Sequence, residues 1–144
     1  MTTKRENILA RIKTVLDSTS GVSSRVYRSR AVALQRNELP AVVIEPLSDS
    51  PEQNTVLPTL DWTLRVRISI IQKGSTSTSP DSAADSIVES MHSLLMADLT
   101  LNGNAIDIQP ADTSFEFIDA DQSGGIIGCE YDIRYRTEVA DLSQ

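Results

Sequence analysis

The fold of this chain is decided by residues 62–70, which read Trp62-Thr63-Leu64-Arg65-Val66-Arg67-Ile68-Ser69-Ile70. Apolar and polar residues alternate through the whole stretch. A period of two is typical of a β-strand with one buried face and one exposed face. The sequence therefore predicts a long strand with a charged outer face. The same alternation returns near the C-terminus, where the apolar positions are Ile127, Cys129, Tyr131, Ile133 and Tyr135.

Two segments have the apolar spacing of amphipathic helices. Residues 4–17 follow the capping box Thr3-x-x-Glu6, in which the two side chains satisfy free N–H groups at a helix start. Residues 81–97 follow Ser79, a residue type that caps helices. Each segment therefore predicts a helix with one buried face. The apolar stripe of the second consists of Ala84, Ile87, Val88, Met91, Leu94 and Leu95.

The rest of the chain supplies shorter strands and connections. We expect strands at residues 25–28, 39–45, 105–108 and 114–118, a tight turn at 101–105, a long loop or irregular edge hairpin at 47–60, and a flexible loop at 73–79. The predicted fold class is α+β: one curved, mostly antiparallel sheet of four to six strands with two helices packed on one face. The whole chain, 1–144, is predicted to form one domain, with a disordered tail at 138–144.

Composition agrees with a single self-sufficient domain. A chain of 144 residues can bury enough surface to fold without disulfides or metals. The only cysteine, Cys129, lies on the apolar side of the last strand and is predicted to be a small core residue. No apolar run reaches the length of a membrane span, and residues 1–5 open a helix instead of a signal peptide. We therefore expect a protein made and kept in the cytosol.

Charge is distributed unevenly along the chain. Residues 1–36 contain eight basic and two acidic residues, a net charge of +6, whereas the remainder contains five basic and eighteen acidic residues, a net charge of −13. The basic third could contact nucleic acid, stay solvated, or meet the acidic part of another copy. Stacking aromatic residues are not interleaved with the basic ones, so self-association is favoured. The interface candidates are Arg25, Arg28, Arg30, Arg36, Lys73, Asp119 and Asp121.

Motifs for catalysis are missing from the sequence. His92 is the only histidine, beside Glu89, and no serine or cysteine stands in a recognisable setting for a nucleophilic triad. The sequence contains no phosphate-binding glycine loop and no cysteine–histidine metal spacing. We therefore expect no enzymatic activity and no cofactor, with His92 in a structural, partly exposed position.

One acidic segment has the spacing of a calcium-binding loop. Asp119, Asp121, Ser123 and Glu130, with Gly124 at the turn, match the ligand positions of an EF-hand. An EF-hand needs a helix on each side, but the flanking sequences alternate like strands. We interpret the segment as an ordinary hairpin turn. An EF-hand and incidental calcium binding are the alternatives.

The order of the predicted elements resembles a known family. The N-terminal amphipathic helix, the apolar run 39–44, the strand 62–71, the Ser/Gly-rich loop and the helix 81–97 occur in this order, followed by 101–105 and a final strand ending at Thr137. This arrangement, over residues 4–138, resembles the tail terminator (tail completion) proteins of long-tailed bacteriophages, the family that includes the lambda minor tail protein U. Residues 47–60 and 119–130 lie outside what matches.

The resemblance implies a structural virion protein of the tail and neck region, present in the host cytoplasm during assembly. It implies a hexameric ring that caps the tail tube, stops tube polymerisation and offers a docking surface to the head/neck connector or stopper protein. DNA would pass through the ring without sequence-specific recognition. The alternatives are another neck ring protein, namely a head–tail connector or stopper, and a small enzyme or calcium-binding α+β domain.

Overall fold

The computed structural model describes residues 2–22, 25–29, 40–53, 56–73, 79–118 and 124–144. Within these ranges the elements follow the predicted order, with a helix first and a second helix between the third and fourth strands. They are α1 (Lys4–Leu16), β1 (Val26–Arg28), β2 (Ala41–Glu52), β3 (Thr59–Lys73), α2 (Pro80–Met96), β4 (Asp107–Ile118) and β5 (Gly124–Glu138).

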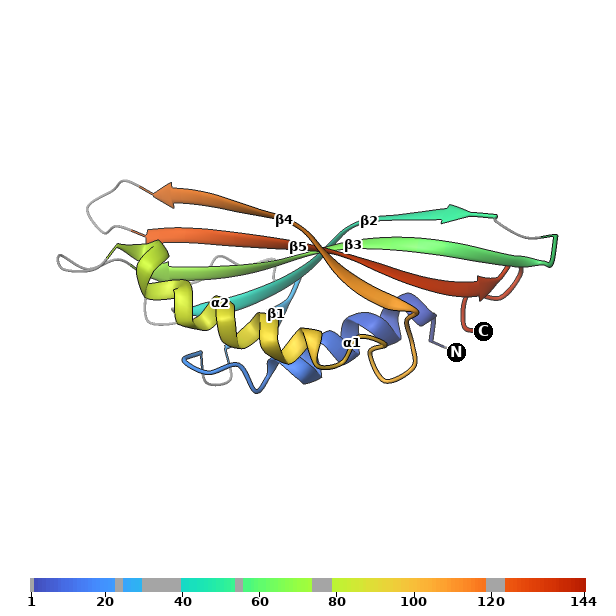
Figure 1. Ribbon diagram of the computed structural model, residues 1–144, viewed down its shortest axis with the longest axis horizontal. Helices are drawn as coiled ribbons and strands as arrows, with labels where there is room; N and C mark the ends of the chain where they lie inside the picture. Colours follow the sequence, from blue (N-terminus) through green and yellow to red (C-terminus); the bar gives the residue numbers. More distant parts are fainter. Residues whose placement is uncertain (1, 23–24, 30–39, 54–55, 74–78, 119–123) are drawn as a thin grey trace.

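The strands form one open, strongly twisted sheet with the order β1-β2-β3-β5-β4. The short β1 runs parallel to β2, and every other neighbouring pair is antiparallel. Both helices lie on the same face of the sheet (Figure 1). The predicted α+β class, with a mostly antiparallel single sheet and two helices on one face, is confirmed.

The core lies between the helices and the inner face of the sheet. The alternating positions of β3 and β5 point inward as predicted, since Leu64 lies opposite Ile133 and Ile68 lies opposite Cys129. Burying these side chains stabilises the fold by about 25 cal/mol for each Å² of apolar surface removed from water. The fully buried side chains include Ile8, Ile12, Leu16, Ile44, Leu64, Ile68, Ile70, Met91, Leu95 and Ile133.

The helix boundaries agree with the capping signals. The Thr3 hydroxyl accepts a hydrogen bond of 3.2 Å from the Glu6 backbone N–H, as in half of a capping box. Ser79 has the extended backbone of an N-cap, but its side chain makes no cap hydrogen bond. Neither helix in the described part of the chain is long and apolar enough to cross a membrane.

The segment between the second and third strands is more regular than predicted. Only the alternative of an irregular hairpin is correct, because β2 continues to Glu52 and pairs with β3, with a bulge between Pro46 and Ser48. Pro51 and Pro58 suggested a loop, and Pro46 suggested a strand end, because proline cannot donate to a strand ladder. Since β1 pairs with β2 only as far as Ile44, one edge of β2 needs no N–H donor beyond that point.

Two further segments are also more ordered than the sequence indicates. The strands predicted at 105–108 and 114–118 are parts of one strand, β4, interrupted by a bulge between Pro110 and Asp112. Residues 138–144, expected to be a disordered tail, form backbone hydrogen bonds: the Leu142 carbonyl accepts from Lys4 N–H and the Pro58 carbonyl from Val139 N–H. These contacts bring the two termini close together (Figure 1).

Candidate functional site

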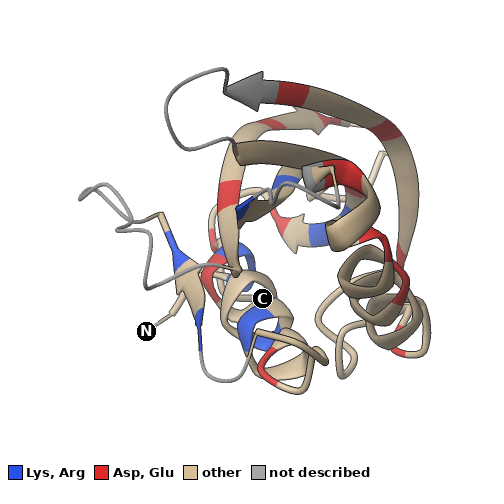
Figure 2. Cartoon of the chain, turned by 90° about the vertical axis from the view of Figure 1, so that its left-hand side faces the viewer, with Lys and Arg blue, Asp and Glu red and all other residues tan. Residues whose placement is uncertain are grey.

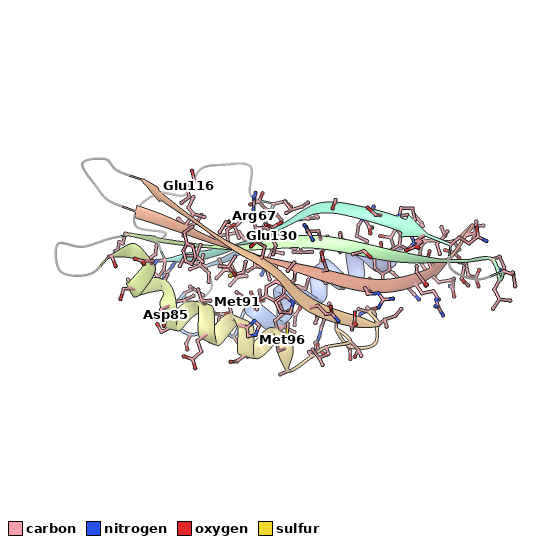
Figure 3. The ribbon with its side chains drawn as sticks, turned by 45° about the horizontal axis from the view of Figure 1, so that its top comes forward. Arg67, Asp85, Met91, Met96, Glu116 and Glu130 are labelled. Atoms are coloured by element: carbon pink, nitrogen blue, oxygen red, sulfur yellow. The ribbon has the colours of Figure 1, made fainter. Side chains whose placement is uncertain are left out.

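The face of the sheet opposite the helices carries a network of ion pairs. Arg65 on β3 binds the Asp132 carboxylate on β5 through two hydrogen bonds of 2.9 and 3.1 Å. Arg67 lies 3.6 Å from Glu45 on β2 and beside Glu130 on β5 (Figure 3). These are cross-strand pairs of opposite charge, each of which stabilises a sheet modestly.

Many charged side chains that the sequence offers for partner binding are paired within the molecule instead. The Arg136 guanidinium binds Asp61 at 2.6 and 3.3 Å. The hydrogen bond to Asp61 raises the pKa of Arg136, and the hydrogen bond to Asp132 raises the pKa of Arg65. The outer charges of β3 and β5 are therefore largely paired within the molecule, so a partner must be sought elsewhere on the surface.

Two of the predicted interface arginines are also held internally. Arg28 on β1 binds both carboxylate oxygens of Glu6 on α1, at 2.7 and 2.9 Å, and this hydrogen bonding lowers the pKa of Glu6. The Arg25 Nε donates to the Pro40 carbonyl at 2.8 Å. Arg28 is thus paired with α1 within the molecule, and its role at a subunit interface stays a prediction. Arg30 and Arg36 lie outside the described residues.

The candidate calcium ligands are only partly described. Glu130 lies within β5 on the charged face, with Arg67 and Asp112 as its neighbours across the strands. Asp119, Asp121 and Ser123 lie outside the described residues, and Lys73 is an exposed residue at the end of β3. Among the residues that the structure describes, no three His, Cys, Asp or Glu side chains gather as a metal site would require.

We expect calcium to leave the melting temperature unchanged. Glu130 is held in the β5 ladder, whereas an EF-hand ligand must fold back over Gly124. A site of micromolar affinity would add about 4 kcal/mol at millimolar calcium, because the ligand would be about a thousandfold above its dissociation constant. Calorimetry with calcium and with chelator measures this difference. An upward shift with calcium that disappears in Asp119→Ala would contradict the prediction.

The remaining reactive side chains occupy structural positions. The His92 Nδ1 lies 2.8 Å from the Tyr131 hydroxyl, which also donates to the Met91 sulfur at 3.7 Å. Cys129 is buried, and burial raises the pKa of its thiol. A buried thiol with a raised pKa is a poor nucleophile. These positions agree with the structural roles predicted for His92 and Cys129.

A surface groove between α2 and the β4 end of the sheet was not predicted from the sequence. It has a volume of about 490 Å³. Phe115 contributes a large apolar side chain that remains 59% exposed. The one available signal was the charge of the two flanking elements, since α2 and β4 contain six acidic residues and no lysine or arginine. The groove is lined by Asp81, Ser82, Asp85, Val88, Thr113, Phe115 and Ile127.

The two edges of the sheet therefore differ in charge. β4, at one edge, contains three acidic residues and no lysine or arginine, whereas β1, at the other edge, contains Arg28, which is paired with Glu6 of α1. Figure 2 shows basic positions on β1 at one edge of the sheet and acidic positions on β4 at the other. A surface of this kind can bind an oppositely charged surface, but two identical acidic edges repel each other.

Comparison with known proteins finds a solved structure with a similar fold. No family model and no curated protein sequence matches the chain. Among solved structures, the chain is similar to a chain in the virion of a native gene transfer agent particle, with a TM-score of 0.62 and 12% sequence identity. The alignment covers 90% of this chain and 94% of the other. The two chains therefore share a fold over most of their length.

Proposed function

We propose that this protein is a non-enzymatic virion component of the tail-terminator type. In this proposal six copies form a ring on the end of a phage tail tube, stop its growth and provide the docking surface for the head/neck connector. The observation that carries the proposal is the fold likeness to a chain of a virion particle, which extends over nearly the whole of both chains.

The charge distribution supports the ring geometry. Residues 1–36 have a net charge of +6 and the remainder a net charge of −13, and this distribution favours a head-to-tail contact between copies, because a contact between two identical regions would juxtapose like charges. Head-to-tail contacts generate closed rings when the rotation between subunits closes, and filaments when it does not. A ring of identical subunits is thus an assembly that this surface can form.

We expect the isolated protein to be monomeric or weakly associated when dilute and to form rings when concentrated. Raising the ionic strength from about 0.1 M to about 1 M shortens the Debye length from about 10 Å to about 3 Å, so contacts between exposed charges weaken. Native mass spectrometry at several concentrations, with sedimentation velocity at both ionic strengths, measures the assembly. A permanent dimer that is insensitive to salt would contradict the prediction.

The role at the tube is tested with the tube protein that assembles in the same virion. Adding the concentrated protein to growing tubes should stop elongation and place a ring at one tube end in electron micrographs. Rings that bind the portal side of capsids and ignore tubes would instead indicate a connector or stopper. A monomer that binds calcium tightly would support the alternative of a metal-binding domain.

A further inference from the structure

The second half of β4 is an exposed strand edge. Among the described strands, β4 pairs with β5 alone. Its first half contains Pro110 and the bulge that ends at Asp112, two features that hinder edge pairing. Residues 113–118 contain no proline and no bulge, and residues 113–116 are all exposed, on both faces of the sheet. The backbone N–H and C=O groups on the free side of such a strand can pair with an added strand.

The side of this edge that faces α2 is apolar. Phe115 is the register partner of Ile127, which is buried, so its side chain lies on the helix-facing side of the sheet. There it is more than half exposed, and Val88 of α2 lines the other side of the groove. An added strand would lie about 4.8 Å from β4 and place every second side chain beside Phe115. Apolar side chains at these positions would remove apolar surface from water.

The side of the edge that faces away from α2 is acidic. It carries Asp112 and Glu116, and Figure 3 shows Glu116 on this side of β4. Asp112 is the register partner of Glu130, and like charges directly opposite each other destabilise a sheet. Among the described residues neither Asp112 nor Glu116 forms an ion pair, and the nearby Arg65 is already bound to Asp132. Basic side chains on an added strand would compensate both acids.

The two sides of the edge together define the segment that fits it. Successive side chains of a strand point to opposite faces, so the added strand needs apolar residues that alternate with lysine or arginine. The apolar residues would face the groove, and the basic residues would face Asp112 and Glu116. Asp81 and Asp85 at the groove, with no lysine or arginine in α2 or β4, add to the preference for a positively charged partner.

The described part of this chain offers no such segment to a second copy. Apolar residues alternate with arginine at 64–67 in β3 and at 133–136 in β5, but both strands are paired on each side within the sheet. Of the strands with a free side at the other edge, β1 has three residues and β2 contains no lysine or arginine. We therefore take the occupant to be a different chain.

We propose that residues 113–118 bind an extended segment of another virion protein by β-strand addition. Its apolar side chains lie in the groove against Phe115, and its basic side chains lie over Asp112 and Glu116. The partner is recognised as a strand with alternating apolar and basic residues, not as a compact surface. The inference rests on the proposed function, for which it names the contact that holds a second protein.

A synthetic peptide tests the edge. The probe is a capped octapeptide of alternating valine and lysine, and the two controls contain the same residues in two blocks or glutamate in place of lysine. We expect the alternating valine–lysine peptide to bind roughly tenfold or more tightly than either control in isothermal titration calorimetry. Its binding should also protect amides of residues 113–118 from hydrogen exchange in NMR spectra, because the added strand accepts their free hydrogen bonds.

Variants of the protein test the two sides of the edge separately. Asp112→Lys with Glu116→Lys should weaken binding of the valine–lysine peptide roughly tenfold or more and make the valine–glutamate peptide the preferred one. A misfolded protein would not show this reversal. Phe115→Ser should weaken binding of both alternating peptides. The matched control is Glu52→Lys with Glu138→Lys, two exposed acids outside α2 and β4, which should bind like the wild type.

The outcomes separate this contact from the proposed ring. Equal binding of the alternating and block peptides, or binding that leaves β4 unprotected, would overturn strand addition even if the wild type forms rings on tubes. Peptide binding at β4 by a wild type that never assembles would support the edge and overturn the ring. Protection of the β4 amides when the wild type alone is concentrated would show that a second copy occupies the edge, and would overturn the assignment to another protein.

Discussion

Leu95→Ala should lower the free energy of unfolding by about 2–5 kcal/mol, the usual cost of removing a large side chain from a packed core. Leu95 lies in the last turns of α2 and is completely buried in the core cluster. The truncation removes apolar contacts and leaves a cavity that the sheet fills only partly. Urea unfolding followed by circular dichroism measures the change.

Leu99→Ala is the matched control for this truncation. Leu99 lies four residues further along the chain, and its side chain is 49% exposed, so its loss should change stability by less than about 0.5 kcal/mol. Globular domains are stable by only about 5–15 kcal/mol, so Leu95→Ala takes a large share of the total. Equal effects of the two substitutions would show that α2 does not pack on the sheet as described.

Stability should fall by about 3 kcal/mol between pH 9 and pH 11 because of two buried tyrosines. Burial, together with the nearby Cys129, raises the pKa of Tyr131 above its ordinary value of 10. Burial and the hydrogen bond to the Asp49 carboxylate raise the pKa of Tyr135. A raised folded-state pKa leaves stability fully present below pH 10 and removes it as the unfolded chain ionises above pH 10. Each tyrosine then contributes about 1.4 kcal/mol per pH unit.

Urea unfolding at a series of alkaline pH values measures this slope, and absorbance at 295 nm follows phenolate formation. Tyr135→Phe should halve the slope contributed by the two tyrosines, because phenylalanine has no proton to lose in the unfolded state. The substitution also removes the hydroxyl that donates to Asp49, so the variant should be less stable than the wild type at neutral pH. A stability that stays flat to pH 11 would contradict the burial of both side chains.

Much of the fold could be predicted because its signals are local. The alternation at 62–70 and 127–135 identifies the two central strands and their buried faces, since side-chain direction in a strand follows directly from sequence position. The capping box at Thr3 and the apolar stripe of residues 84–95 place the helices in the same way. These features depend on neighbours a few residues apart, which the sequence displays.

The prolines led to a wrong loop prediction because their effect on a strand is not local. Pro51 and Pro58 suggested a loop at 47–60, and Pro46 suggested the end of a strand, yet Pro46 and Pro51 both lie within β2. A proline interrupts a strand only where its missing N–H would have paired. Whether a strand edge is paired depends on the order of strands in the sheet, and that order is a property of the whole chain.

The surface that is available to a partner also depends on the tertiary structure. The sequence by itself determined the elements, their buried faces and the contrast between a net charge of +6 in residues 1–36 and of −13 in the remainder. Only the tertiary structure showed that Arg28 is paired with Glu6, that Arg65 is paired with Asp132, and that α2 and β4 enclose a groove around Phe115. The physical reason is that a charge becomes available to a partner only if no opposite charge within the fold lies close to it. That proximity joins residues as many as 87 positions apart, as in the ion pair of Arg11 with Asp98.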